Sequence, residues 1–215
     1  NFSARTAALD DALGVGRCFD MTARDLTIGG RRARLWVVNG YAQEGGLERI
    51  IAQWLAAPDL SDMKTPDAFL RCFVTACDAA VCLKKEAAVL GVFSGKTLLV
   101  VDGWDGGILM DVKQFPTRSI EEPDTSRVLR GSHDGFVENL MQNAALLRRR
   151  IRDSRLTLER VQLDNRSHTD VVLCYMDGEA DPELLAEIRE KLENMQVGSI
   201  AMSQESVAEA LSPRQ

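Results

Sequence analysis

The chain contains 215 residues, of which 45% are hydrophobic and 27% are charged, as in ordinary globular proteins. Its formal net charge of -6 argues against general nucleic-acid binding, which depends on a basic surface, and leaves only a local basic patch open. The length is enough for one large domain or for two small ones that each bury a core.

Five cysteines occur, and their spacing contains neither a CxxC pair nor a zinc motif that includes histidine. Cys72, Cys77 and Cys82 recur every five residues, so on a helix each thiol would point about 140° away from the previous one. We therefore expect free thiols in a reducing compartment, with no metal site and no disulfide framework. No apolar run is long enough to span a bilayer. Because the chain starts at Asn1 and ends in a polar SPRQ tail, we expect it to be a segment of a longer protein.

The first half of the chain predicts several helices and two hairpins. Apolar residues alternate on both sides of Gly29-Gly30, and this pattern predicts a β-hairpin because glycine accepts the positive φ angles of a tight turn. The sequence TLLVVDGWDGGILMDV, residues 97–112, predicts a second hairpin around a turn rich in Asp and Gly. Helices are predicted for Ser3–Leu13, Leu47–Ala56, Pro66–Ala76 and Lys85–Val92.

The second half begins with the Pro- and charge-rich stretch QFPTRSIEEPD, residues 114–124, which we interpret as a boundary. The predicted fold class is α/β, with two small subdomains, 1–117 and 118–215, that each contain a mixed sheet and are joined by a charged linker and a long helix. Strands are predicted for Leu156–Leu163, Asp170–Met176 and Ser199–Met202. Helices are predicted for 123–130, Asp134–Arg152 and Pro182–Met195, with a last one from Ser203 or Gln204.

Two short motifs resemble parts of active sites, and both fail on geometry. GVFSGKT, residues 91–97, lacks the first glycine of a P-loop at the required spacing and leads into a predicted strand instead of a helix. Ser132, His133 and Asp134 are consecutive, so their side chains diverge and cannot form a catalytic relay. We therefore predict that the chain has no catalytic residue, needs no cofactor and is not an enzyme.

The predicted long helix carries the most informative polar residues. Asn139 and Asn143 fall on one face in line with Arg150, and asparagine is a poor residue for a helix interior, so this face suggests hydrogen bonds to another element or chain. Cations are favourable at a helix C-terminus, but the arginines here exceed that need. An ion-pair network, internal or between chains, is favoured over phosphate binding. Its candidate acidic partners are Glu121, Glu122 and Asp124.

The sequence around this helix resembles a known family. RGSHDGFVENLMQNAALLRRRIRD, residues 130–153, with DVKQFPTRSIEEPDTSRV before it and RSHTDV after it, is similar to the N-terminal soluble region of the GerA spore germination protein family. The opening GVGRCFDM and the later LTIGGRRARLWVVNGY are similar to the sporulation branch of that family. Ser154, where the family commonly has proline, and His168, where lysine is usual, depart from its pattern.

The resemblance implies a role in a membrane complex. It implies a polytopic protein of the spore inner membrane whose soluble N-terminal region faces the spore interior, with a membrane domain beyond Gln215. Family members form oligomeric complexes that respond to germinants and release ions, and the sporulation branch assists that release. The implied partners are the protein's own membrane domain, other protomers and other spore germination membrane proteins, with no nucleic acid. The isolated domain is expected to be monomeric or weakly associated because the membrane segments supply effective concentration.

The resemblance and the charge pattern together favour an assembly and gating module. The alternative is a sensor module that binds a small molecule or an anion through Arg118, Arg127, Arg130 and the later arginines. The residues predicted to form an interaction surface or a structural joint are Arg118, Glu122, Arg127, Arg130, Asp134, Glu138, Asn139, Asn143, Arg148, Arg149 and Arg150.

Overall fold

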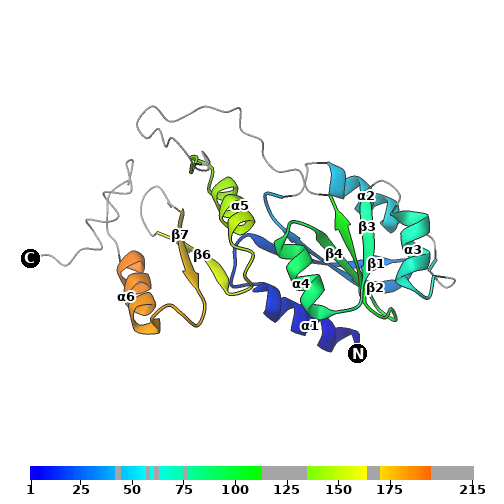
Figure 1. Cartoon of the computed structure of the whole chain (residues 1–215), viewed down its shortest axis with the longest axis horizontal. Coiled ribbons are helices and arrows are strands. Elements are labelled where there is room, and N and C mark those ends of the chain that lie inside the picture. The colour runs from blue at the N-terminus through cyan, green and yellow to red at the C-terminus, as the bar shows by residue number, and fades with distance from the viewer. Residues whose placement is uncertain are drawn as a thin grey trace, which may run out of the picture. The chain divides into compact units, whose positions relative to one another are not determined.

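A computed structural model shows the fold of the chain in residues 1–41, 45–56, 59–60, 63–74, 77–112, 135–163 and 170–194. These residues form helices and antiparallel sheets, which confirms the predicted α/β class (Figure 1). They belong to two compact units, one made of Asn1–Gly16 and Asp20–Ser154, the other of Arg17–Phe19 and Arg155–Gln215. Among the described residues, no helix is both long enough and apolar enough to cross a bilayer.

Unit 1, the larger unit, is built on a five-stranded sheet with the strand order β1-β2-β4-β5-β3. Every neighbouring pair in it is antiparallel, so the mixed sheet that we expected is wrong for this unit. Two of the neighbouring pairs, β1–β2 and β4–β5, are hairpins, which join antiparallel strands directly. The strands are β1 (Met21–Ile28), β2 (Arg31–Val38), β3 (Asp78–Cys82), β4 (Thr97–Val101) and β5 (Gly107–Asp111).

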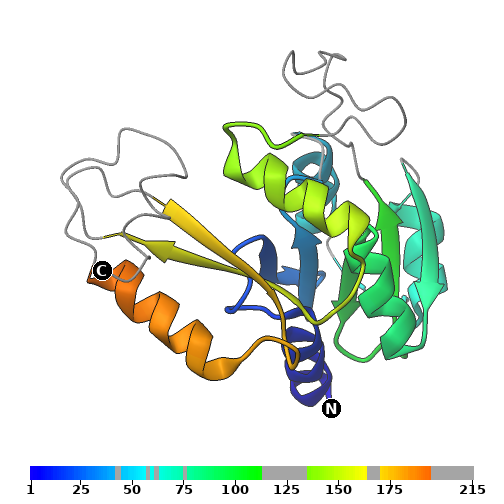
Figure 2. The same cartoon turned by 60° about the vertical axis from the view of Figure 1, so that its left-hand side comes forward.

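Helices cover both faces of this sheet (Figures 1 and 2). All five residues of β4 are buried, and since successive side chains of a strand point to opposite faces, both faces must be covered there. One core includes Trp54, Phe69 and Trp104, with Leu99 and Val101 of β4. The helices of unit 1 are α1 (Phe2–Leu13), α2 (Gly46–Leu55), α3 (Pro66–Phe73), α4 (Lys85–Phe93) and α5 (Leu140–Arg150).

The first hairpin turns at Gly29-Gly30, as the sequence predicted. Ile28 pairs with Arg31, so the loop has two residues, and both have positive φ, 49° and 78°. A type I′ turn requires this combination, which glycine adopts without steric cost. Gly29 is also crowded, because a Cβ built on it would lie 2.6 Å from Cγ of the buried Leu60.

Unit 2 contains an antiparallel pair of strands, β6 (Leu156–Gln162) and β7 (Asp170–Met176), and the helix α6 (Pro182–Glu193). Leu163 and Leu192 form its buried centre, with partly buried apolar residues from both strands and from α6 around them. The short segment Arg17–Phe19 lies along β6, where the Phe19 amide donates to the Leu158 carbonyl at 3.0 Å.

The units divide at Ser154 and Arg155, whereas the sequence placed the boundary at 117/118. The difference arises because α5 packs within unit 1 instead of beginning the second unit. The Pro- and charge-rich stretch, the predicted helix at 123–130, and the predicted strand and helix after residue 198 lie outside the described residues.

The two glycines of the first turn offer a matched pair of substitutions. Gly30→Ala meets nothing within 4 Å and should cost only the strain of positive φ, about 1–2 kcal/mol. Gly29→Ala should cost about 2 kcal/mol more, because its methyl group overlaps Leu60. Urea unfolding of the two variants measures the difference. Equal destabilisation would show that the contact with Leu60 does not restrict residue 29.

Candidate functional site

The helix α5 begins at Leu140, six residues later than the predicted start at Asp134. Asn139 is its N-cap, with φ -83° and ψ 112°, and its side-chain oxygen accepts from the amides of Met141 and Gln142 at 2.9 and 3.1 Å. An asparagine side chain competes well for the free amides of a first turn. The interpretation of Asn139 as a residue inside the helix is therefore wrong.

Asn143 also uses its side chain locally. Its Oδ1 accepts from the Val137 amide at 2.8 Å, and its Nδ2 donates to the Val137 carbonyl at 2.7 Å. These two bonds close the segment before the helix onto its second turn. The two asparagines thus stabilise the start of α5, which removes the reason to assign them to a partner-binding face.

Arg148 lies in a buried ion pair with Asp20, the residue just before β1. Arg148 Nε and Nη2 donate to the two carboxylate oxygens of Asp20 at 2.8 and 3.1 Å, and both side chains are 0% exposed. The guanidinium also lies over the Phe93 ring of α4, 5.0 Å from its centroid, in a cation–π contact. The backbone carbonyl of Asp20 accepts from the Asn39 amide at 2.7 Å, which fixes the backbone of Asp20 next to the residue that follows β2.

A second contact fixes the middle of α5. The Tyr41 hydroxyl donates to the Ala145 carbonyl at 3.0 Å, and burial raises the pKa of Tyr41 to about 12. Gly40, with φ 85°, allows the close approach, because a Cβ there would lie 3.2 Å from Met141 and 3.3 Å from Ala145. The side chains of Arg148 and Tyr41 therefore attach α5 to the sheet of unit 1. We call Asp20, Gly40, Tyr41 and Arg148 the α5 joint.

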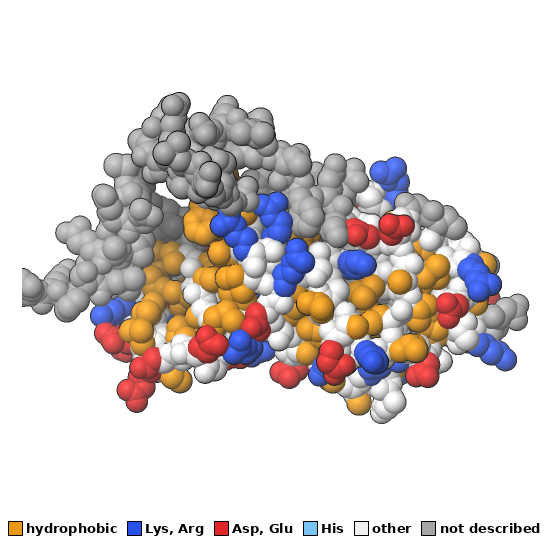
Figure 3. Space-filling view, viewed as in Figure 1, with side chains coloured by type: hydrophobic (Ala, Val, Ile, Leu, Met, Phe, Trp, Pro, Cys, Tyr) orange, Lys and Arg blue, Asp and Glu red, His pale blue; other side chains and the backbone are white. Residues whose placement is uncertain are grey.

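The other arginines at the end of α5, together with Arg152 just after it, lie toward the surface. Arg149 is half-buried, whereas Arg150 and Arg152 are exposed, and Arg152 Nε donates to the Arg149 carbonyl at 3.3 Å. Lys and Arg side chains gather on the surface where α5 lies (Figure 3). Glu138, before the helix, is exposed as well. The end of α5 therefore presents positive charge to the outside.

The structure thus separates the predicted site residues into groups. One group lies outside the described residues. It contains the predicted acidic partners of the arginines and also Arg118, Glu122, Arg127, Arg130 and Asp134. Asp20, Gly40 and Tyr41 were missed by sequence reasoning. Asp20 stood inside the quoted opening GVGRCFDM, but nothing local indicated an arginine partner. In the described ranges, no group of three or more His, Cys, Asp and Glu side chains could hold a metal ion.

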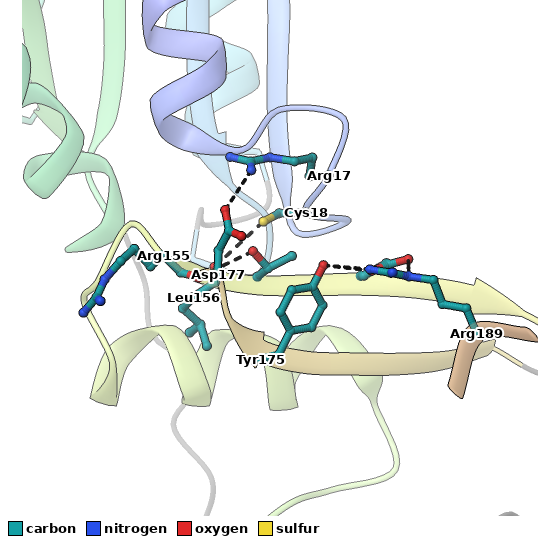
Figure 4. Close-up of polar contacts among 9 residues, drawn as sticks. Arg17, Cys18, Arg155, Leu156, Tyr175, Asp177 and Arg189 are labelled. Carbon is teal, nitrogen blue, oxygen red and sulfur yellow. Dashed lines mark hydrogen bonds and ion pairs between the residues drawn. The ribbon is translucent and has the colours of Figure 1, made fainter. Parts of the chain in front are cut away.

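A second polar cluster lies within unit 2 (Figure 4). Arg189 of α6 donates to both carboxylate oxygens of Glu159 at 2.8 and 2.7 Å, and the Tyr175 hydroxyl donates to the same carboxylate at 3.0 Å. The hydrogen bonds from Arg189 are the main cause that lowers the pKa of Glu159, and burial opposes them. This cluster attaches α6 to β6 and β7 and therefore stabilises the fold of unit 2.

We expect each charge of the α5 joint to depend on the other. Asp20→Leu or Arg148→Met alone should lower the free energy of unfolding by about 3–5 kcal/mol, because a buried charge is left without its partner. The double variant should recover much of this loss. Denaturant unfolding of the four proteins measures the coupling.

Arg17→Met is the control for that cycle. Arg17 pairs with Asp177 at 3.1 Å with both side chains about half exposed, so its loss should cost less than about 1 kcal/mol. A single substitution of Asp20 or Arg148 that cost no more than this control would contradict the assigned role of the buried pair.

The Glu159 cluster predicts a pH dependence. Since its pKa is lower in the folded chain, its contribution is present above the unfolded value of about 4.3 and is lost as the pH falls through the folded pKa. Glu159→Gln should therefore be about 1 kcal/mol less stable than the parent chain near neutral pH, and this gap should close below pH about 4. Thermal unfolding across this range tests it, with the exposed Glu179→Gln as control. A gap that stayed constant with pH would contradict the assignment.

Comparison with known proteins places these features in a family. A family model described as Bacillus/Clostridium GerA spore germination protein matches residues 8–215. Stage V sporulation protein AF of Bacillus subtilis (strain 168) is 32% identical over 200 residues, which cover 92% of this chain and 40% of that protein. Uncharacterized membrane protein YfkQ of the same organism is 34% identical over 121 residues, covering 56% of this chain and 23% of that protein. The chain spans less than half the length of these relatives.

A solved structure has the same fold. The N-terminal domain of the A subunit of the Bacillus megaterium spore germinant receptor GerK3 superposes with a TM-score of 0.71. The match covers 99% of this chain and 80% of that chain at 21% sequence identity, so it shows the fold alone.

Proposed function

Because the chain belongs to the GerA spore germination protein family, we propose that it is the N-terminal assembly and gating module of a spore membrane protein that helps to release ions during germination. The match over residues 8–215 is the observation that carries this proposal. One relative is named a membrane protein, and the relatives are more than twice as long as the region matched here, which leaves room in them for a membrane domain. The proposed location is the inner membrane of the spore, with this module on its interior side.

The contacts that hold α5 within unit 1 support this role. The α5 joint holds the helix at two places, and Asn139 and Asn143 fix its start. A surface on a fixed helix loses little conformational entropy when a partner binds, so its contacts contribute more fully to affinity. The residues that favoured an anion sensor, Arg118, Arg127 and Arg130, lie outside the described ranges. We favour assembly because α5 is fixed within unit 1 and its last turn carries exposed positive charge, and we propose the cationic end of α5 as the contact surface.

The partner of this surface is proposed to be another protomer or the membrane domain. Arg150 and Arg152 are exposed, and arginine binds carboxylates through two parallel hydrogen bonds. An acidic surface on the partner would be complementary. Because the chain would meet its partner at the high effective concentration that a common membrane gives, each contact can be weak.

Charge reversal tests the proposal in the full-length membrane protein. Arg149→Glu with Arg150→Glu should reduce the yield of crosslinked oligomers in membranes at least severalfold, because like charges would then face an acidic partner. Lys84→Glu with Lys85→Glu is the matched control, since both lysines are exposed in unit 1 and have no side-chain partner in the described part of the chain. Circular dichroism of the isolated chain should show that both variants remain folded.

Two results would contradict the proposal. Undiminished oligomer bands from the doubly reversed protein would assign these arginines to a solvated helix end. A tight oligomer of the isolated chain would contradict the view that the membrane supplies the effective concentration. Sedimentation of the isolated chain should instead give a species near the monomer mass of 23.7 kDa.

A further inference from the structure

A second positively charged site lies in unit 1, at the turns of the two hairpins. Three segments that are distant in sequence meet there: the β1–β2 turn, the residues before α3, and the β4–β5 turn. They form an open pocket of about 520 Å³. Its lining residues are Gly30, Arg31, Arg32, Lys64, Asp102 and Gly103.

The walls of this hairpin pocket are held by buried contacts. The Trp104 indole donates to the Met63 carbonyl at 2.9 Å, which places the residues before α3 beside the β4–β5 turn. Trp104 is 3% exposed and packs against the Phe69 ring at 5.1 Å between centroids. The Asp102 amide donates to the Arg32 carbonyl at 2.8 Å and joins the two hairpins. The lining backbone is therefore preorganised.

The charges in the pocket do not cancel. Arg32 is already in an ion pair, since its Nε and Nη2 donate to one oxygen of Asp102 at 3.1 and 2.8 Å. The side chains of Arg31 and Lys64 have neither a hydrogen bond nor an ion pair in the ranges that the structure describes. Arg5 adds positive charge behind the turn, where its Nη1 donates to the Trp104 carbonyl at 2.7 Å. Within the described residues, the pocket thus has two cations without an ionic partner, in a chain whose net charge is -6.

The glycines leave room for a ligand. A Cβ on Gly30 would meet nothing within 4 Å, and one on Gly103 would meet only Nη1 of Arg31, at 3.8 Å. Both glycines have positive φ, 78° and 85°, so the chain keeps residues without side chains at the two turns. An oxygen of a ligand could therefore approach the turn backbone closely.

We propose that the hairpin pocket binds a small multivalent oxyanion of the phosphate type. The Arg31 guanidinium provides parallel N–H donors that match two oxygens, and the Lys64 ammonium provides a compact positive charge for a third. The ion pair with Asp102 keeps Arg32 in place and neutralises the one lining carboxylate. This binding is independent of the assembly role of α5. Since the pocket is open to solvent, its affinity should fall as salt rises.

The test uses the ¹⁵N-labelled 215-residue chain and inorganic phosphate at constant ionic strength. Amide resonances of Gly30, Lys64 and Gly103 should shift and saturate. Arg31→Gln with Lys64→Gln should weaken the apparent affinity by at least about tenfold, the equivalent of about 1.4 kcal/mol. Arg24→Gln is the matched control, because Arg24 is an exposed arginine of β1 outside the pocket and should leave the affinity unchanged.

A second arm distinguishes a free phosphate from a lipid headgroup. Sedimentation with phosphatidic acid vesicles, compared with phosphatidylcholine vesicles, shows whether the same two residues hold a phosphate on a membrane. Binding in either arm that depends on Arg31 and Lys64 supports the pocket and identifies the source of the phosphate. The proposal is overturned if neither arm shows binding, if shifts disappear at matched ionic strength, or if the double variant binds as well as the parent chain.

Discussion

The buried ion pair between Arg148 and Asp20 is the interaction on which the arrangement of unit 1 depends. Both side chains are fully buried, so the desolvation of two charges opposes folding, and only a close paired geometry offsets that cost. The bidentate contact and the ring of Phe93 supply this geometry. Because either charge alone would be buried without a partner, α5 has to pack where Arg148 reaches Asp20. The pair therefore acts as a positional constraint as much as a source of stability.

This constraint changes how the polar residues of α5 should be interpreted. Asn139 and Asn143 complete the start of the helix, and Arg148 completes its attachment, so three conspicuous residues serve the fold. The contacts that we propose with other molecules therefore involve the arginines at the end of the helix and not these three residues.

Elements with a strong local signal could be predicted from the sequence, and elements that depend on distant partners could not. The turn at Gly29-Gly30 and the α6 start at Pro182 follow from backbone preferences alone. The strand β3 was missed because DAAVC is short and rich in small residues. The start of α5 was misplaced because asparagine suits either a cap or a turn. The partner of Arg148 could not be identified among 32 acidic residues, since Asp20 is 128 positions away.

The path of the chain through unit 2 has a consequence for biosynthesis. This unit combines Arg17–Phe19, made early on the ribosome, with strands and a helix that follow Arg155. The hydrogen bond from the Phe19 amide to the Leu158 carbonyl can therefore form only after almost all of unit 1, which lies between them in sequence, has been synthesised. Unit 2 can therefore be completed only after unit 1 has been synthesised, and a gene fragment that starts at Arg155 would encode it without the segment that lies along β6. During synthesis from the N-terminus, the backbone of Arg17–Phe19 thus lacks its partner strand until β6 has been made.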